Sequence, residues 1–235
     1  ALLDDEHGRH WELAPEAHAD ETTRRKQMYV ADTNVLYTRF NTDQGRSKQV
    51  DVMAVEDAPQ RVVRVVDGIR GTVAYRMRCA PRFDYARAKH RVEARGRNEV
   101  IFIPEQGTPL RLRASVPLEI VGSDVQASFK VSAGESASFV LEEDGDERSD
   151  ELGGQRTIEQ AVAYWRRLLA RSTYRGRWRE MVHRSTLLLK LLTCNEHGPI
   201  IAAPTFGLPE VDGGAIATGT TATPGSVTRA SRSTR

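Results

Sequence analysis

The sequence predicts a mainly β protein with a helical C-terminal part, and three observations carry that prediction. Between Gln27 and Leu141, short segments rich in Val, Ile, Thr and aromatic residues alternate with Gly, Pro, Asp and Asn, which is the pattern of an all-β region. From Thr157 onward, apolar residues recur at three- and four-residue spacing, as in an amphipathic helix. A strongly acidic stretch separates the two regions, so we expect a β-sandwich joined to helices by a linker.

The β region contains eight strand-like segments, enough for two packed sheets. They read TNVLYTRF, QVDVMAV, RVVRVV, TVAYRMRC, EVIFI, LRLRASVPLEIV, VQASFKVS and SASFVLEE. Turn formers separate them, for example Asp67-Gly68 between RVVRVV and TVAYRMRC. TVAYRMRC alternates as a strand with one buried face should: Val73, Tyr75 and Met77 share one side, Arg76 and Arg78 the other. We therefore expect the sandwich to occupy residues 1–141.

Residues 142–156 are expected to form a solvated linker. The segment EEDGDERSDE (142–151) carries seven carboxylates and one Arg, and two Gly follow shortly after it. A metal-binding acidic loop is the alternative, but the segment lacks the spaced ligands and terminal Glu of a calcium loop. A helix should then run from Thr157 to Ser172, with Thr157 as N-cap and Gln160 in the capping-box position.

A second helix is predicted to begin near Gly176. Its apolar stripe steps by four and three and consists of Trp178, Val182, Ser185, Leu189 and Leu192. Leu187, Leu188 and Leu191 widen the apolar face, so this helix should need neighbours on more than one side. The segment from Ala215 onward has no carboxylate, no aromatic residue and no Leu, which predicts a disordered tail over residues 215–235.

Charge and cysteine content argue against several classes of partner. The chain of 235 residues carries 34 Lys+Arg against 32 Asp+Glu, a formal net charge of +2, so we expect no nucleic-acid partner. Nine basic residues between Arg156 and Lys190 could form a phosphate-binding face. We interpret them instead as Arg stems that cover apolar surface, because we expect no aromatic residue beside them on an exposed face. The three Arg of the tail, Arg229, Arg232 and Arg235, are too few to change this expectation.

We expect a cytoplasmic protein without membrane contact. No run approaches the ~18 consecutive apolar residues of a membrane helix, and the first residues are charged where a signal peptide would be apolar. Cys79 and Cys194 form neither a multi-bridge scaffold nor a Cys-x-x-Cys pair, which indicates a reducing compartment. The chain begins at Ala1 without an initiator Met, so we expect that something upstream is missing.

The residues by themselves indicate no catalytic, cofactor-binding or metal site. The six histidines (7, 10, 18, 90, 183 and 197) lack ligand spacing, and His7 with His10 is interpreted as part of a frayed terminus. The motifs Gly-x-Ser-x-Gly, Gly-Lys-Ser/Thr and Gly-x-Gly-x-x-Gly after a strand are all absent. The most conspicuous carboxylates are expected to pair with Arg: Asp32, Asp51, Asp84 and Glu180.

Two C-terminal segments resemble a known enzyme family. YRGRWREMVHRSTLLLKLLT (174–193), followed by GPIIAAPTFGLPEVDGG (198–214), resembles the opening of the catalytic domain in bacterial family 15 glycoside hydrolases, the glucoamylase- and trehalase-like enzymes. DTNVLYTRF (32–40), GIRG (68–71) and CAPRFDYAR (79–87) resemble, in order, the N-terminal domain of those proteins. The resemblance implies a sandwich lacking its first strands, then a linker helix and the start of an (α/α)6 barrel over residues 157–214. It also implies hydrolysis of an α-glucosidic bond with inversion, with trehalose and a starch-like glucan both open as substrates.

The chain departs from the family after Gly214. There the family has an aromatic motif, approximately R-N-W-D-Y-R-Y-x-W-x-R-D-A, and its two catalytic glutamates lie later still; an inverting enzyme needs both. If the reading frame is shifted so that each codon starts at the third base of the original one, the codons for Ile216 to Thr228 can encode R-[DN]-W-D-Y-R-Y-T-W-I-R-D. We therefore expect a frameshift near Ala215 and a truncated, inactive relative of the glycosidases.

An interaction module is the alternative function. In that case the sandwich would bind a carbohydrate, or would dock onto an intact enzyme through the leucines of the second helix. The resemblance implies that later barrel helices cover these leucines, so we expect them to be exposed and to favour self-association. They are Leu188, Leu189, Leu191 and Leu192.

Overall fold

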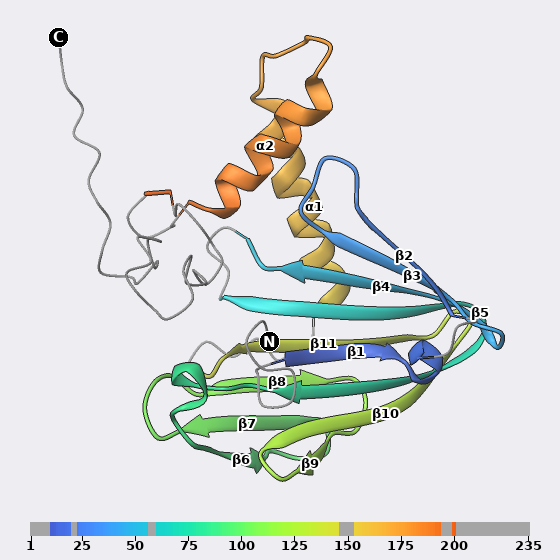
Figure 1. Cartoon of the computed structure of the whole chain (residues 1–235), viewed down its shortest axis with the longest axis vertical. Helices are drawn as coiled ribbons and strands as arrows, with labels where there is room; N and C mark the ends of the chain where they lie inside the picture. The colour runs from blue at the N-terminus through green and yellow to red at the C-terminus, as the bar shows by residue number, and fades with distance from the viewer. Residues whose placement is uncertain (1–9, 20–22, 56–59, 146–152, 194–198, 201–235) are drawn as a thin grey trace, which may run out of the picture. The chain divides into compact units, whose positions relative to one another are not determined.

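The computed structural model describes residues 10–19, 23–55, 60–145, 153–193 and 199–200, and Figure 1 shows their arrangement. The chain divides into two compact units, residues 1–167 and 168–235. The division falls inside the first helix and not at the acidic stretch. The predicted tail at 215–235, residues 146–152 of the predicted linker, His7, His197 and Cys194 lie outside the described residues.

The first unit is a sandwich of antiparallel strands, as the sequence predicts, with eleven strands among the described residues. Its larger sheet consists, in spatial order, of β2 (Arg24–Tyr29), β3 (Leu36–Asn41), β4 (Gly45–Met53), β5 (Arg61–Ala80), β11 (Ser136–Glu143), β8 (Leu110–Ala114), β7 (Glu99–Pro104) and β6 (His90–Ala94). The smaller sheet consists of β9 (Glu119–Val121), β10 (Asp124–Ser132), β5 and β1 (His10–Pro15).

Strand β5 belongs to both sheets. Residues up to Gly71 pair with β4, and residues up to Asp67 pair with β11, whereas the part from Thr72 onward pairs with β10, and part of it also with β1 (Figure 1). The turn predicted at Asp67-Gly68 is therefore wrong. The chain bends there without reversing: a Cβ on Gly68 would lie 2.0 Å from the Ser132 carbonyl oxygen, and Gly71 has φ +65°. Glycine permits both the close approach and the positive φ.

Other strand boundaries also differ from the prediction. The segment LRLRASVPLEIV forms two strands, β8 and β9, and the prediction missed β1, β2 and β6. His10, expected in a frayed terminus, lies in β1 and pairs with Ala80. The alternation in β5 is confirmed, because Val73, Tyr75 and Met77 are buried in the core whereas Arg76 is exposed.

The core lies between the two sheets and is built mainly from aliphatic and aromatic side chains. Phe102, Phe139 and Tyr75 are fully buried in it. Phe129 packs against two rings, lying 5.6 Å from Tyr75 and 5.4 Å from Phe139 between ring centroids. Aromatic pairs at this spacing stabilise a core beyond the area they bury.

The first helix, α1 (Gly154–Ala170), begins against the outer side of the larger sheet. A Cβ on Gly154 would lie 3.0 Å from Val65 Cγ2. Thr157 lies within the first turn and its buried Oγ1 accepts a hydrogen bond from Arg61 Nη2 at 3.1 Å. The prediction of Thr157 as N-cap was wrong because its hydroxyl serves this contact with β5 and the helix starts three residues earlier.

The second unit contains α2 (Arg179–Leu191), three residues later than the predicted start near Gly176. Its buried residues are His183 and Leu187. The predicted stripe is therefore wrong, since Ser185 and Leu189 are exposed. No helix in the described part of the chain has both the length and the apolarity to cross a membrane.

Candidate functional site

The inter-sheet side of β4 is polar. Ser47, Gln49 and Asp51 alternate along this strand and face the smaller sheet: Ser47 Oγ lies 2.7 Å from the Tyr75 hydroxyl, and Gln49 pairs in register with the core residue Val66. The other side of β4 carries Val50 and Val52, which are also buried. This strand therefore turns its polar side toward the core, opposite to the usual arrangement of a sandwich.

Arg64 of β5 joins this polar row to β1. Its Nε lies 3.2 Å from Asp51 Oδ1, its Nη1 donates a hydrogen bond to the Trp11 carbonyl oxygen, and its guanidinium carbon lies 4.5 Å from the centroid of the Trp11 ring. Gln49 Nε2 donates to both carboxylate oxygens of Asp51 at 3.0 Å. We call Trp11, Gln49, Asp51 and Arg64 the polar seam.

The ion pair of the seam is mostly buried but keeps some exposure to solvent. The Arg64 and Asp51 side chains are 21% and 18% exposed. Burial lowers the pKa of Arg64, and the nearby Asp51 carboxylate opposes that shift, so the pair remains a salt bridge. Burial also raises the pKa of the neighbouring Cys79 thiol to about 12, against the effect of Arg64. Cys79 is therefore a buried, unreactive thiol.

Three buried polar atoms of the seam have no hydrogen-bond partner among the described residues. Two are donors, the indole Nε1 of Trp11 and the Nε of Arg64, and one is an acceptor, the amide Oε1 of Gln49. The Gln49 residue is 6% exposed, so water has little access to this acceptor. Buried polar groups in proteins are usually hydrogen-bonded, so these atoms are exceptions within an otherwise paired cluster.

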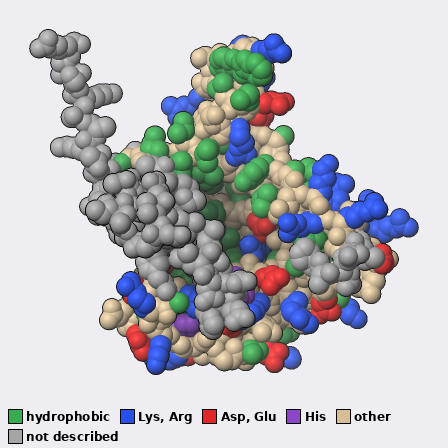
Figure 2. Space-filling model, in the orientation of Figure 1, with side chains coloured by type: hydrophobic (Ala, Val, Ile, Leu, Met, Phe, Trp, Pro, Cys, Tyr) green, Lys and Arg blue, Asp and Glu red, His purple; other side chains and the backbone are tan. Residues whose placement is uncertain are grey.

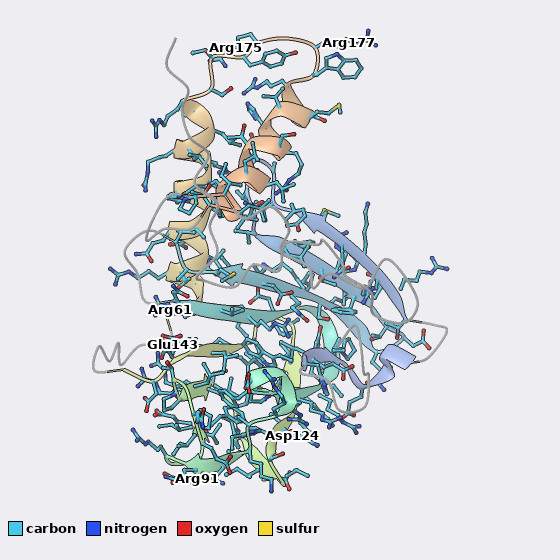
Figure 3. The ribbon with its side chains drawn as sticks, turned by 60° about the vertical axis from the view of Figure 1, so that its left-hand side comes forward. Arg61, Arg91, Asp124, Glu143, Arg175 and Arg177 are labelled. Atoms are coloured by element: carbon cyan, nitrogen blue, oxygen red, sulfur yellow. The ribbon has the colours of Figure 1, made fainter. Side chains whose placement is uncertain are left out.

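A second charged cluster lies at the end of β5. Arg78 and Arg82 both donate hydrogen bonds to Asp124, each at 2.8 Å and each to a different carboxylate oxygen; Figure 3 shows Asp124 at the start of β10. Burial opposes ionisation of Asp124, but these hydrogen bonds outweigh it and lower the pKa of the carboxyl below its usual range. Both carboxylate oxygens and both guanidinium nitrogens of these contacts are paired within the cluster. We therefore interpret the cluster as a structural link between the end of β5 and the start of β10.

The loop after this cluster has a strained backbone. Asp84 and Ala86 have φ values of 45° and 68°, a region that costs a non-glycine residue roughly 1–2 kcal/mol. At its tip, Arg87 Nη2 lies 2.7 Å from Asp84 Oδ1, and both side chains are exposed. At its base, Phe83 packs against the ring of His90 at 5.2 Å.

A third cluster is buried on the outer side of the larger sheet. Arg111 Nη2 and Arg113 Nη2 each lie 2.9 Å from Glu142 Oε1, and all three side chains are at most 9% exposed. Glu142 was expected in the solvated linker. It lies instead in β11, because the two arginines of the neighbouring β8 neutralise its charge.

The carboxylates singled out in the sequence lie on separate elements. Asp51 pairs with Arg64, and Asp84 pairs with Arg87, as predicted. Asp32 lies in the turn before β3, and Glu180 lies exposed in the first turn of α2. Within the described ranges, no three His, Cys, Asp or Glu residues are grouped as metal ligands would be.

The second unit presents aromatic and basic side chains together at its surface. Tyr174 and Trp178 are 37% and 56% exposed, and the guanidinium carbon of Arg177 lies 4.9 Å from the Trp178 ring centroid. Figure 3 shows Arg175 and Arg177 at the tip of the loop before α2, and Figure 2 shows hydrophobic side chains gathered at the same end. The expectation that no aromatic residue accompanies the basic residues on an exposed face was therefore wrong, because these residues lie in a loop and not on a helix face.

Of these clusters, the polar seam brings together the widest variety of hydrogen-bonding groups. A guanidinium, a carboxylate, an amide and an indole converge there, and this set recognises hydroxyl groups by hydrogen bonding. Proton transfer is not favoured, since Asp51 contacts Arg64 and Gln49 and no second carboxylate of the described residues is shown in contact with it. Sequence reasoning missed Trp11, Gln49 and Arg64; the available signal was the alternation of Ser, Gln and Asp within RSKQVDVM.

Comparison with known proteins identifies relatives. A family model described as "Trehalase-like, N-terminal" matches residues 1–165. A trehalase of Thermoplasma acidophilum is 27% identical over 203 residues, which cover 80% of this chain and 33% of that enzyme. A trehalase of Mycolicibacterium smegmatis is 30% identical over 172 residues, covering 67% of this chain and 25% of the enzyme.

The matched region corresponds to the sandwich together with most of α1. A trehalase of Thermoplasma volcanium matches over a longer stretch, with 26% identity over 223 residues, or 91% of this chain and 35% of the enzyme. The chain thus spans about a third or less of the length of these relatives. Because the family model covers well over half of its residues, the chain belongs to the trehalase-like N-terminal domain family.

Proposed function

We propose that this chain forms the β-sandwich domain and the first helices of a family 15-type, trehalase-like glycoside hydrolase. The match of the family model to residues 1–165 is the observation that carries the proposal. The sandwich holds and orients the catalytic region and supplies no catalytic carboxylate, because its acidic residues in the clusters above are engaged by arginines. Trehalose is the first substrate to test, since the relatives are trehalases.

The test has two arms. The purified chain is incubated with trehalose and with maltooligosaccharides, and released glucose is measured; we expect none above a buffer blank. The chain is then added to the Thermoplasma acidophilum trehalase from which the matching segment has been removed. Recovery of trehalose hydrolysis would support the proposal that the sandwich holds and orients the catalytic region. Hydrolysis by the chain alone would contradict the proposal that the chain supplies no catalytic carboxylate.

We further propose that residues 216–228 are read in a shifted frame. The proposal is supported by the agreement of twelve successive alternative codons with one aromatic family motif. Determining the nucleotide sequence across Ala215 tests it directly. Third-position bases that fail to encode the Trp-Asp-Tyr core of the motif would refute the frameshift, and the assignment of the sandwich would be unaffected.

A further inference from the structure

Two rows of basic side chains cross the outer side of the larger sheet, from β2 through β3 to β4 and β5. On β4, Arg46 and Lys48 alternate with Ser47 and Gln49, which face the smaller sheet, so the two basic residues face away from it. Residues paired in register on neighbouring strands share a face. The register therefore defines two rows, which we call the basic face: Lys26, Arg39 and Lys48 in the first, and Arg24, Asn41, Arg46 and Arg70 in the second.

Negative charge beside the basic face comes from one side chain. Among the described residues in register with the two rows, Asp67 is the only carboxylate, and its Oδ2 lies 2.7 Å from Lys48 Nζ. Arg46 Nε donates a hydrogen bond to the neutral Asn41 at 2.8 Å. Like charges directly opposite each other destabilise a sheet, and Arg46 is opposite Arg70 in this way. An anionic partner would relieve that repulsion.

The basic side chains are accessible at the surface. Arg24, Lys26, Arg46 and Arg70 are exposed, and the Lys48 side chain is 33% exposed. Figure 2 shows Lys and Arg side chains at the right-hand side of the molecule, toward which β2, β3 and β4 extend in Figure 1. A surface cavity of about 420 Å³ is lined by Arg46 and Arg70 together with the turn between β3 and β4. A partner can therefore meet these cations without entering the core.

The residues that border the basic face favour a protein as the partner. The next residues in register on this side are Met28, Tyr37 and Val50. Met28 is 38% exposed, and Tyr37 is half-buried, with the Arg39 guanidinium carbon 5.9 Å from its ring centroid. Arg, Tyr and Met are enriched in protein–protein interfaces. Single-stranded nucleic acid instead uses exposed aromatic rings on which its bases stack, and the one ring of these rows is half-buried.

We propose that the basic face and the adjoining Met28 bind an acidic segment of another polypeptide chain. Carboxylates of that segment pair with the arginines of the two rows, whose planar guanidinium groups match a carboxylate in geometry. An apolar side chain of the segment contacts Met28. The inference concerns the sandwich alone, so it stands or falls independently of the proposed role in hydrolysis.

The experiment measures the fluorescence anisotropy of labelled acidic peptides of about twelve residues, titrated with the full chain at about 50 mM salt. Some peptides contain a Leu at the centre or at either end, and others have Ser in its place. An oligothymidylate of the same charge is the comparison. We expect saturable binding of the acidic peptides, tighter with Leu than with Ser, and weaker binding of the oligonucleotide. In Met28→Ser, the preference for Leu should disappear.

Two double variants locate the binding. Arg24→Gln with Lys26→Gln removes one cation from each row and should weaken binding of the acidic peptides about tenfold. The matched control, Arg25→Gln with Lys130→Gln, removes the same charge elsewhere. Arg25 points to the opposite side of β2 from its two neighbours, and Lys130 lies exposed in β10. The control should change the affinity by less than about twofold.

Three results overturn the proposal. The first is the absence of saturable binding with every acidic peptide. The second is an equal loss of affinity in the control variant, which would show that the net charge of the chain, and not the basic face, attracts the peptides. The third is tighter binding of the oligothymidylate than of any peptide, which would assign the face to a nucleic acid.

Discussion

The two halves of the inter-sheet interior differ in chemistry although one strand, β5, runs through both. Its C-terminal half contributes Val73, Tyr75 and Met77 to an apolar core, whereas its N-terminal half contributes Arg64 to the polar seam. The apolar half is stabilised by burial and close packing. The polar half depends on paired charges, which contribute less to the free energy of unfolding. Removing one partner of such a pair is strongly destabilising, because the other charge is left buried and unpaired. We therefore expect loss of packing to cost the most stability in the first half, and loss of one charge to matter most in the second.

The largest expected effect lies in the apolar half. Phe139→Ala removes a fully buried ring that packs on Phe129, and we expect the free energy of unfolding to fall by about 3–5 kcal/mol. Urea denaturation measures it. Ile69→Ala, at a side chain that is 44% exposed, is the control and should change little. A loss below about 1 kcal/mol for Phe139→Ala would mean that this half is not closely packed.

Breaking the ion pair of the polar half should lower the free energy of unfolding by less, and a second substitution should restore most of the loss. Arg64→Met leaves Asp51 without its partner, and we expect a loss of about 1–3 kcal/mol, less than for a fully buried pair because both side chains retain some exposure. The double variant Arg64→Met with Asp51→Leu should recover most of that loss, since no charge is left unpaired. Equal losses in the single and double variants, measured by urea denaturation, would show that packing and not charge governs the seam.

At the border between the halves, alkaline pH should destabilise the protein. Burial raises the pKa of Cys79 from 9.0 to about 12 and that of Tyr75 from 10.0 to about 12. The unfolded chain therefore loses these protons first, and the free energy of unfolding falls as pH rises through the window from about 9 to 12.

Replacing the thiol isolates its share of this alkaline effect. In Cys79→Ala, we expect the decrease between pH 8 and pH 10 to be smaller than in the parent by roughly 1 kcal/mol. Urea denaturation at the two pH values checks it, and an unchanged difference would mean that the thiol titrates normally in the folded protein.

Acid pH should act through Asp124, whose folded-state pKa is lowered once its hydrogen bonds with Arg82 and Arg78 outweigh its burial. The unfolded chain binds more protons below pH about 4, so stability is present above that value and is lost as pH falls through the folded-state pKa. Asp124→Asn should flatten this acid dependence in thermal unfolding. Asp84→Asn, at an exposed ion pair, is the matched control and should leave the slope nearly as it is.

The smallest effect on stability is expected at α2, outside both halves. Leu188, Leu189 and Leu191 are 51%, 51% and 48% exposed, as predicted, whereas Leu192 is only half-buried. We propose that these leucines mediate self-association. Leu188→Gln with Leu191→Gln should lower the apparent mass in analytical ultracentrifugation while changing the free energy of unfolding by less than about 0.5 kcal/mol. A parent chain that sediments as a monomer at all concentrations would contradict it.

Sequence reasoning succeeded where a local period was sufficient. The alternation of apolar and basic residues around Tyr75 located a strand with one buried face, and the helical spacing after residue 157 located α1. It assigned no inner face to β4, because a period of two shows which residues share a side but not which side meets the other sheet. In β4 both sides are buried, with Val50 and Val52 on one and Ser47 and Gln49 on the other, so hydrophobicity alone does not identify the inner face.

By itself, the sequence determined the order of a β region and a helical region and carried the motifs of a trehalase-like family. Only the tertiary structure decided that β5 continues through Gly68 into the second sheet, that Glu142 lies buried between two arginines, and that Thr157 binds Arg61 across 96 residues of sequence. The physical reason is range. Propensity and periodicity act over neighbouring residues, whereas close backbone approach, charge pairing and hydrogen bonding of a buried hydroxyl depend on partners that are distant in sequence and become neighbours only when the sheets pack.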